Sequence, residues 1–169
     1  MIYPIVKFGN PVLERPTEPV TIFDDKLRSL IDDMFDSMYA AHGVGLAANQ
    51  IGISMRLTVI DTSFKEDPTQ KLVLVNPRVI TAEGRDTQQE GCLSLPEIRE
   101  SVTRPTLLTI RAQDAHGDWY ERTGEGLLAR ALAHEIDHLD GKLFISYISA
   151  LKRDLIKRKI KKMMNEGQW

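Results

Sequence analysis

The stretch EGLLARALAHEIDHLDG, residues 125–141, predicts the helix around which the rest of the chain is arranged. His134 and His138 are four residues apart, so on a helix both imidazoles project from one face and can bind the same metal ion. Glu135 lies about 100° further round the helix, within reach of a metal-bound water without being a ligand itself. The alternative is a helix that carries two partly buried histidines and no metal.

Cys92, the only cysteine in the chain, is the third ligand that we expect for this metal. A catalytic site needs three protein ligands and one open position for water. Phe144 stands where metzincins carry their last histidine, and the acids after Gly141 lie in or beside a basic tail. A lone cysteine is more often a core residue, but a two-histidine site that lacks a ligand favours coordination. One thiolate and two imidazoles suit Fe(II), Zn(II), Co(II) or Ni(II), and argue against Mg(II) or Ca(II).

The glycine-rich segment GVGLAANQ, residues 43–50, matches the dinucleotide fingerprint G-x-G-x-x-A. That fingerprint requires a strand before it, whereas the apolar pattern here predicts a long helix. Glycines in a loop also let an extended ligand approach the backbone closely. From this segment alone, a ligand-binding loop and a simple helix stop remain equal alternatives.

Apolar periodicity predicts an α+β fold with short antiparallel strands around the central metal-binding helix. Three helices are expected: a long N-terminal one from about Asp24 to Ala41, the central one from near Glu125 to Leu139, ended by Gly141, and a basic C-terminal one from about Ser149 to Asn165. Strands are expected at Leu57–Asp61, Lys71–Val75 and Leu107–Ala112, with a hairpin turn at Asp114–Asp118 leading to Trp119.

Composition fits one globular domain, since 42% of the 169 residues are hydrophobic. We expect residues 1–148 to form the hydrolase and residues 149–169 to be a basic helix and tail of the same domain. No apolar run of membrane-spanning length and no signal peptide is apparent, so we expect a cytoplasmic protein without a membrane partner. Net charge is −2, but residues 150–166 carry seven bases against two acids, which is typical of an arm for an anionic partner.

Three segments together resemble the peptide deformylase family. That family carries G-x-G-L-A-A-x-Q, E-G-C-L-S and H-E-x-D-H in this order, and the chain has GVGLAANQ at 43–50, EGCLS at 90–94 and HEIDH at 134–138. Residues 4–16 and 102–104 also resemble the family, so the likeness spans most of the chain. The absence of large insertions and the C-terminal helix resemble its type 1 bacterial branch.

The resemblance implies removal of the N-formyl group from the initiator methionine of nascent polypeptides, with release of formate. It implies that the metal acidifies its water, that Glu135 takes the proton and delivers it to the leaving amine, and that the Gln50 side chain and the Leu93 backbone N–H stabilise the oxyanion. Fe(II) is the expected native metal, with Zn(II), Ni(II) and Co(II) as alternatives. The C-terminal helix is expected to dock on the ribosome near the peptide exit.

The substrate peptide is expected to lie along residues 43–46 and 91–93 as an added strand. Leu127 and Ala131 share the His134 face of the helix and are expected to line the methionine pocket, with Val44 on the opposite wall. The expected substrate-binding residues are Val44, Gly45, Gly91, Arg104, Leu127 and Ala131. Arg130 is expected at the pocket rim with its head in water; His42 and His116 are left out as a helix end and an exposed turn.

Two other functions use the same residues. A zinc endopeptidase would cleave internal peptide bonds with the same helix, but Phe144 and the missing downstream acidic ligand count against it. A catalytically silent protein whose basic helix binds RNA is the second alternative. It has no need of an intact set of Cys92, His134, Glu135 and His138, which counts against it.

Overall fold

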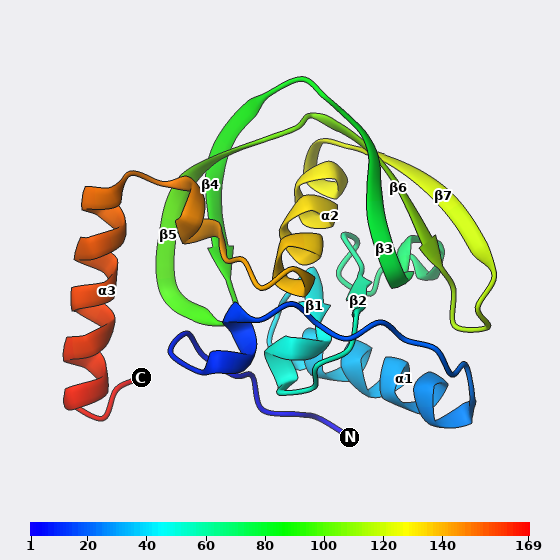
Figure 1. Cartoon of the computed structure of the whole chain (residues 1–169), viewed down its shortest axis with the longest axis horizontal. Coiled ribbons are helices and arrows are strands. Elements are labelled where there is room, and N and C mark those ends of the chain that lie inside the picture. Colours follow the sequence, from blue (N-terminus) through cyan, green and yellow to red (C-terminus); the bar gives the residue numbers. More distant parts are fainter.

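Two antiparallel sheets flank the central helix in the computed structural model, which describes residues 1–169 (Figure 1). The larger sheet has the strand order β1 (Gly45–Ala47), β2 (Leu57–Ile60), β3 (Leu72–Glu83), β6 (Leu107–Gln113) and β7 (Trp119–Glu125). The smaller sheet pairs β4 (Asp86–Cys92) with β5 (Leu95–Arg104). The helices are α1 (Asp25–Ala40), α2 (Gly126–Leu139) and α3 (Ala150–Asn165), so the expected α+β class is confirmed.

Helix α2 lies in the middle of the molecule because its small and apolar residues pack tightly on the larger sheet (Figure 1). Ala129, Leu132 and Ile136 share a buried cluster with Ile110 of β6. The helix ends before Gly141, whose φ of +78° favours glycine. An added Cβ at Gly141 would also lie 2.7 Å from the Arg15 backbone. The C-terminal end of α2 is therefore fixed against the N-terminal segment.

Helix α1 begins as expected, since the Asp24 side chain accepts a hydrogen bond from the Leu27 N–H. Its buried residues, Leu27, Ile31, Met34, Phe35 and Met38, pack with residues of β1 and β2 in one apolar cluster. This packing places the C-terminal end of α1 directly before the glycine-rich segment.

Two parts of the sheets differ from the sequence-based expectation. Strand β3 runs well past Val75, because a bulge at residues 75–78 carries the ladder past Pro77. Asn76 supports this bulge with a φ of +51° and side-chain hydrogen bonds to both backbone groups of Val20. The β4–β5 hairpin was not predicted, because β4 (Asp-Thr-Gln-Gln-Glu-Gly-Cys) is almost entirely polar.

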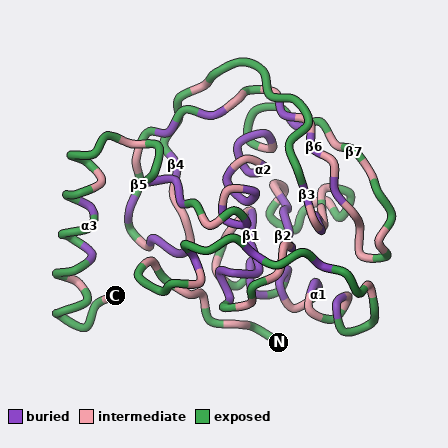
Figure 2. The backbone as a smooth tube through the Cα atoms, in the orientation of Figure 1, coloured by how far each residue is buried: buried purple, intermediate pink, exposed green.

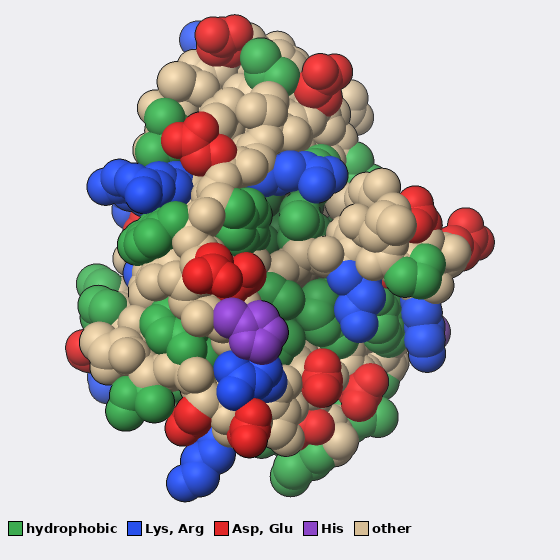
Figure 3. Space-filling model, turned by 90° about the vertical axis from the view of Figure 1, so that its right-hand side faces the viewer, with side chains coloured by type: hydrophobic (Ala, Val, Ile, Leu, Met, Phe, Trp, Pro, Cys, Tyr) green, Lys and Arg blue, Asp and Glu red, His purple; other side chains and the backbone are tan.

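Helix α3 packs at one edge of the molecule and is exposed along most of its length (Figure 2). Its Ile156 and Ile160 are buried against Leu13 and Leu95, whereas Leu155 points outward. The opposite side of the molecule carries acidic and basic side chains interspersed around hydrophobic ones (Figure 3), without an extended patch of one sign. None of the helices is long and apolar enough to cross a membrane.

Candidate metal centre

Cys92, His134 and His138 converge at the centre of the molecule, with their ligating atoms all within 4.8 Å of one another. The Cys92 Sγ lies 3.2 Å from the His138 Nε2, which lies 3.0 Å from the His134 Nε2. The histidines lie on one face of α2 as their spacing predicts. Cys92 comes from the end of β4, where the ladder shifts register after Gly91. One thiol and two imidazoles in this arrangement fit a transition metal or zinc, with one position left for water.

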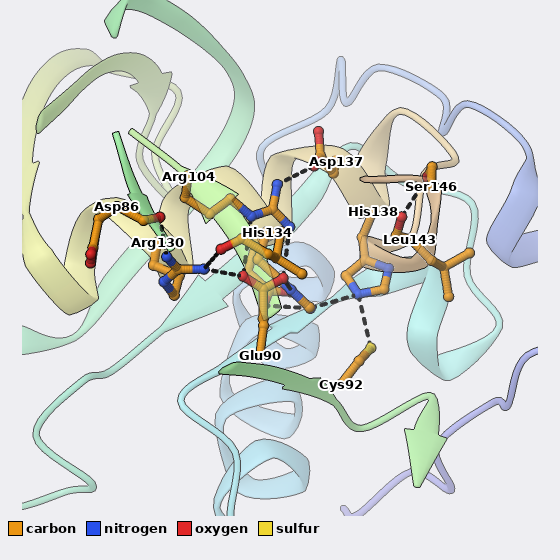
Figure 4. A network of polar contacts seen from close by, with 12 residues as sticks. Asp86, Glu90, Cys92, Arg104, Arg130, His134, Asp137, His138, Leu143 and Ser146 are labelled. Atoms are coloured by element: carbon orange, nitrogen blue, oxygen red, sulfur yellow. Dashed lines mark hydrogen bonds and ion pairs between the residues drawn. The ribbon is translucent and has the colours of Figure 1, made fainter. Parts of the chain in front are cut away.

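Glu90 orients the first histidine (Figure 4). Its Oε2 lies 2.7 Å from the His134 Nδ1, so that nitrogen carries the proton and Nε2 is free for a metal. Arg104 donates to both oxygens of Glu90, at 3.1 and 2.7 Å, and to Asp137 at 2.6 Å. Arg130 donates to the Glu90 Oε1 at 3.0 Å. The two arginines and two acids form a buried network without net charge.

This network corrects two expectations. Arg130 lines the cavity, but its guanidinium does not extend into water, because it is buried and donates to the backbone carbonyls of Val102 and Asp86. Arg104 does not line the substrate cavity and is 4% exposed, so the expectation that it contacts the substrate directly is not met in this structure. Burial alone would raise the pKa of Glu90, but the hydrogen bonds from His134 and Arg104 outweigh it and hold that pKa well below its ordinary value.

Glu135 is 4% exposed and its Oε1 has no hydrogen-bond partner. Burial raises the pKa of Glu135 to about 7, in the range where a carboxyl can both take and give a proton near neutral pH. Its Oε2 lies beside Gly45, where an added Cβ would be 2.5 Å away. Only glycine at position 45 therefore leaves room for Glu135 in this place.

Gln50 is held by both ends of its side-chain amide. Its Oε1 accepts from the Ala47 N–H at 3.0 Å, and its Nε2 donates to the Ser94 Oγ at 3.1 Å. The same Nε2 lies 3.6 Å from the Cys92 Sγ. The Gln50 amide therefore donates to Ser94 and to Cys92, and of these only Cys92 belongs to the cluster of candidate ligands. Asn49 supports the centre from behind by donating to the His138 carbonyl at 2.6 Å.

A cavity of about 580 Å³ opens beside these ligands. It contains most of the residues that the sequence indicated: Val44, Gly45, Gln50, Gly91, Cys92, Leu93, Leu127, Ala131, His134 and Glu135. His138 lies behind it, fully buried. Residues outside the three motifs also line it, among them His42, Phe64, Pro96, Glu97 and Arg99. Pro96–Arg99 directly follow the EGCLS motif, a signal that could have found them; Phe64 had none.

Phe144 stands at the position of the third metzincin histidine. It is buried, and its ring centroid lies 6.5 Å from that of His134. The residue therefore packs behind the metal centre, and the third donor comes from β4.

Comparison with known proteins finds one family. A family model described as polypeptide deformylase matches residues 2–154. A peptide deformylase from Acidobacterium capsulatum is 63% identical over 169 residues, covering 100% of this chain and 99% of the relative. One from Alkalilimnicola ehrlichii is 46% identical over 167 residues, covering 99% and 93%. The crystal structure of a peptide deformylase from Legionella pneumophila superposes with a TM-score of 0.92 at 44% identity, covering 99% of this chain and 98% of that one.

Proposed function

Since this chain belongs to the polypeptide deformylase family, metal-dependent hydrolases that remove the formyl group from the N-formylmethionine of nascent peptides, we propose that Cys92, His134 and His138 hold the metal for that reaction. The observation that carries the proposal is the convergence of these three donors beside the buried carboxylate of Glu135, whose Oε1 has no hydrogen-bond partner. A bound divalent metal supplies Lewis acidity and lowers the pKa of water.

The side chains around the metal ligands transfer the proton and stabilise the developing negative charge. Glu135 takes the proton of the attacking water and delivers it to the leaving amine. The Nε2 of Gln50 and the backbone N–H of Leu93 donate to the oxygen that becomes negative as the formyl carbon is attacked. The fixed orientation of the Gln50 amide supports this role, because an oriented donor needs no reorganisation during the reaction.

The substrate backbone lies between two strand edges. Strand β1, which begins at Gly45 directly after Val44, is one edge of the larger sheet, and β4, with Gly91, pairs only with β5. Both edges line the cavity and leave backbone groups for an added strand. The methionine side chain packs on Leu127 and Ala131, which lie two turns and one turn before His134 on α2.

The test is anaerobic purification with metal analysis, followed by a formate-release assay on formyl-Met peptides. We expect one equivalent of metal and formate release, with no cleavage of internal peptide bonds. Absence of formate with Fe(II), Zn(II), Ni(II) and Co(II) alike would defeat the proposal.

Fe(II) is our proposal for the native metal. Iron on a thiolate can pass electrons to oxygen, after which Cys92 is oxidised toward sulfenic and sulfinic acid. The iron form should therefore lose activity in air faster than the nickel or cobalt form. Equal half-lives in air for the iron and nickel forms count against a redox-active native metal.

Helix α3 is our proposed contact with the ribosome in the cytoplasm, as an integral part of the same domain. Leu151 and Leu155 are exposed one turn apart, among the seven bases of residues 150–166. Such a surface suits phosphate contacts that weaken steeply with salt, and local capture raises the concentration of nascent substrate. Co-sedimentation with ribosomes at low and high salt should show weaker binding for a chain ending at Ala150 and for Leu151→Ser/Leu155→Ser. Equal binding by the full chain and both variants contradicts this contact.

A further inference from the structure

An aromatic residue from outside the three motifs lies at the mouth of the cavity. Phe64 follows β2 in the connection 61–71 and lines the cavity, while 57% of its surface is exposed. Most of its ring is thus available to another molecule. No ring contact or cation–π pair joins Phe64 to the candidate ligands or to Glu135 and Gln50, so the hydrolysis itself does not account for it.

The backbone holds Phe64 in an unfavourable conformation. Its φ is +53° and that of Lys65 is +75°, in the left-handed region that bulky side chains rarely adopt. The buried carboxylate of Asp61 maintains this turn by accepting from the Ser63 N–H at 2.9 Å and the Lys65 N–H at 3.2 Å. The Tyr39 hydroxyl donates to the same carboxylate. Conformations of this kind persist where the surroundings fix them, and they are frequent at ligand-binding sites.

The position of Phe64 follows from the pairing of β1 and β2. Gly45 is the residue that lies against Glu135, and the preceding residue, Val44, accepts a hydrogen bond from the Asp61 N–H at 2.8 Å. The chain from His42 to Val44 precedes β1 and reaches Gly45 from outside the reacting centre. The connection that carries Phe64 starts beside this outer part, and His42 lines the same cavity.

We propose that Phe64 is a specificity-determining residue, which packs on an apolar side chain at the second or third residue of the formyl-Met peptide. This rests on the proposed placement of the peptide along β1. A peptide whose formyl group reaches Glu135 has its methionine in the pocket of Leu127 and Ala131. Its following residues lie along residues 42–44, where Phe64 is the large apolar group nearest to solvent. Partial burial of an apolar side chain on the exposed Phe64 ring should raise kcat/KM by about 3- to 10-fold.

The test compares formyl-Met-Ala-Ala with formyl-Met-Leu-Ala and formyl-Met-Ala-Leu. The parent enzyme should favour leucine at one of the two positions by about 3- to 10-fold in kcat/KM, mainly through KM. Phe64→Gly should abolish this preference, and Phe64→Leu should keep most of it. Glycine accepts the positive φ at position 64, so a lost preference in Phe64→Gly cannot be ascribed to backbone strain.

Ile22→Ala is the matched control, because Ile22 is similarly exposed but does not line the cavity. It should keep the parent's ratio between the peptides. A parent that releases formate from all three peptides without preferring leucine, or a Phe64→Gly variant that keeps the preference, overturns the role of Phe64 and leaves the proposed reaction intact. A parent that releases no formate from any peptide overturns the proposed reaction itself.

Discussion

Glu135 is buried beside the metal ligands, yet it belongs to none of the hydrogen-bond networks that fix them. Glu135→Gln should therefore keep the metal and lose turnover by about 10²- to 10⁴-fold, because the amide cannot carry the proton. Metal analysis and formate release on the same preparation measure both quantities. Cys92→Ala is the contrasting variant and should lose metal as well as activity. Near-normal turnover of Glu135→Gln would show that a group other than Glu135 transfers the proton of the attacking water.

Glu90 is a positioning residue that acts through His134. Glu90→Gln removes the charge that two buried arginines face, so we expect a loss of about 3–5 kcal/mol in stability. Without a carboxylate on the His134 Nδ1, metal affinity should fall about 10- to 100-fold. Chemical denaturation and metal titration measure these effects, and the exposed Glu121→Gln is the control. Unchanged metal affinity in a folded Glu90→Gln protein would contradict the orienting role.

The sequence indicated the metal ligands but not this network, for a physical reason. His134, Glu135 and His138 are local to one helix, so their spacing alone predicts a shared site. The partners of Glu90 are Arg104 and Arg130, which come from β5 and α2 and meet only in the folded chain. Long, charged side chains are usually exposed, and this general rule predicted the wrong surroundings for Arg130.

At the level of single elements, the turn after β2 depends on the ionised carboxylate of Asp61. Burial raises the pKa of Asp61, but hydrogen bonds from Ser63 and Tyr39 outweigh it and lower the pKa below its ordinary 3.8. A lowered pKa contributes stability that is complete above about pH 4 and is lost as the pH falls further. Asp61→Asn should therefore be less stable by on the order of 2 kcal/mol at pH 7, and the difference should shrink below pH 4. Melting curves at pH 7 and pH 3 test this, with exposed Asp118→Asn as control; a constant difference would contradict it.

The apolar residues of helix α3 fall into two groups, one packed on the domain and the other exposed. Ile160 is 2% exposed and packs on the domain, so Ile160→Ala should lower stability by about 2–5 kcal/mol. Leu155 is more than half exposed, and Leu155→Ala should change stability by less than about 0.5 kcal/mol. Urea denaturation of both variants tests this assignment. A large loss for Leu155→Ala would mean that the outer face of α3 also packs on this chain.

Helices were predictable to within about a residue, and strands less so. Asp24 and Ser149 cap α1 and α3 as their side chains suggest, and Gly141 ends α2. Strand β4 has no apolar alternation, because one of its edges lines the cavity and several of its residues belong to the site. The extension of β3 depends on a bulge that Asn76 fixes through Val20, a contact that no local pattern contains.

For the whole molecule, the metal ligands join its two sheets. Cys92 belongs to the smaller sheet, whereas His134 and His138 lie on the helix that packs on the larger one. A metal at 100 times its dissociation constant adds about 2.7 kcal/mol of stability, or about 5–10 °C in Tm for a chain of this size. Chelation should lower the Tm by this amount, and Cys92→Ala should be much less sensitive to chelator. A Tm independent of free metal would show that the two sheets do not need this link.

The two open strand edges, β1 and β4, restrict which conformations of a polypeptide can enter the cleft. On the proposed placement, they recognise backbone N–H and C=O groups, which every residue carries and which a helix or a paired strand has already used. Only an unfolded chain end can enter. The enzyme therefore has a limited time for each substrate, from the emergence of the first residues until they fold. Proteins whose N-terminal segment folds early should keep their formyl group more often than those in which it folds late.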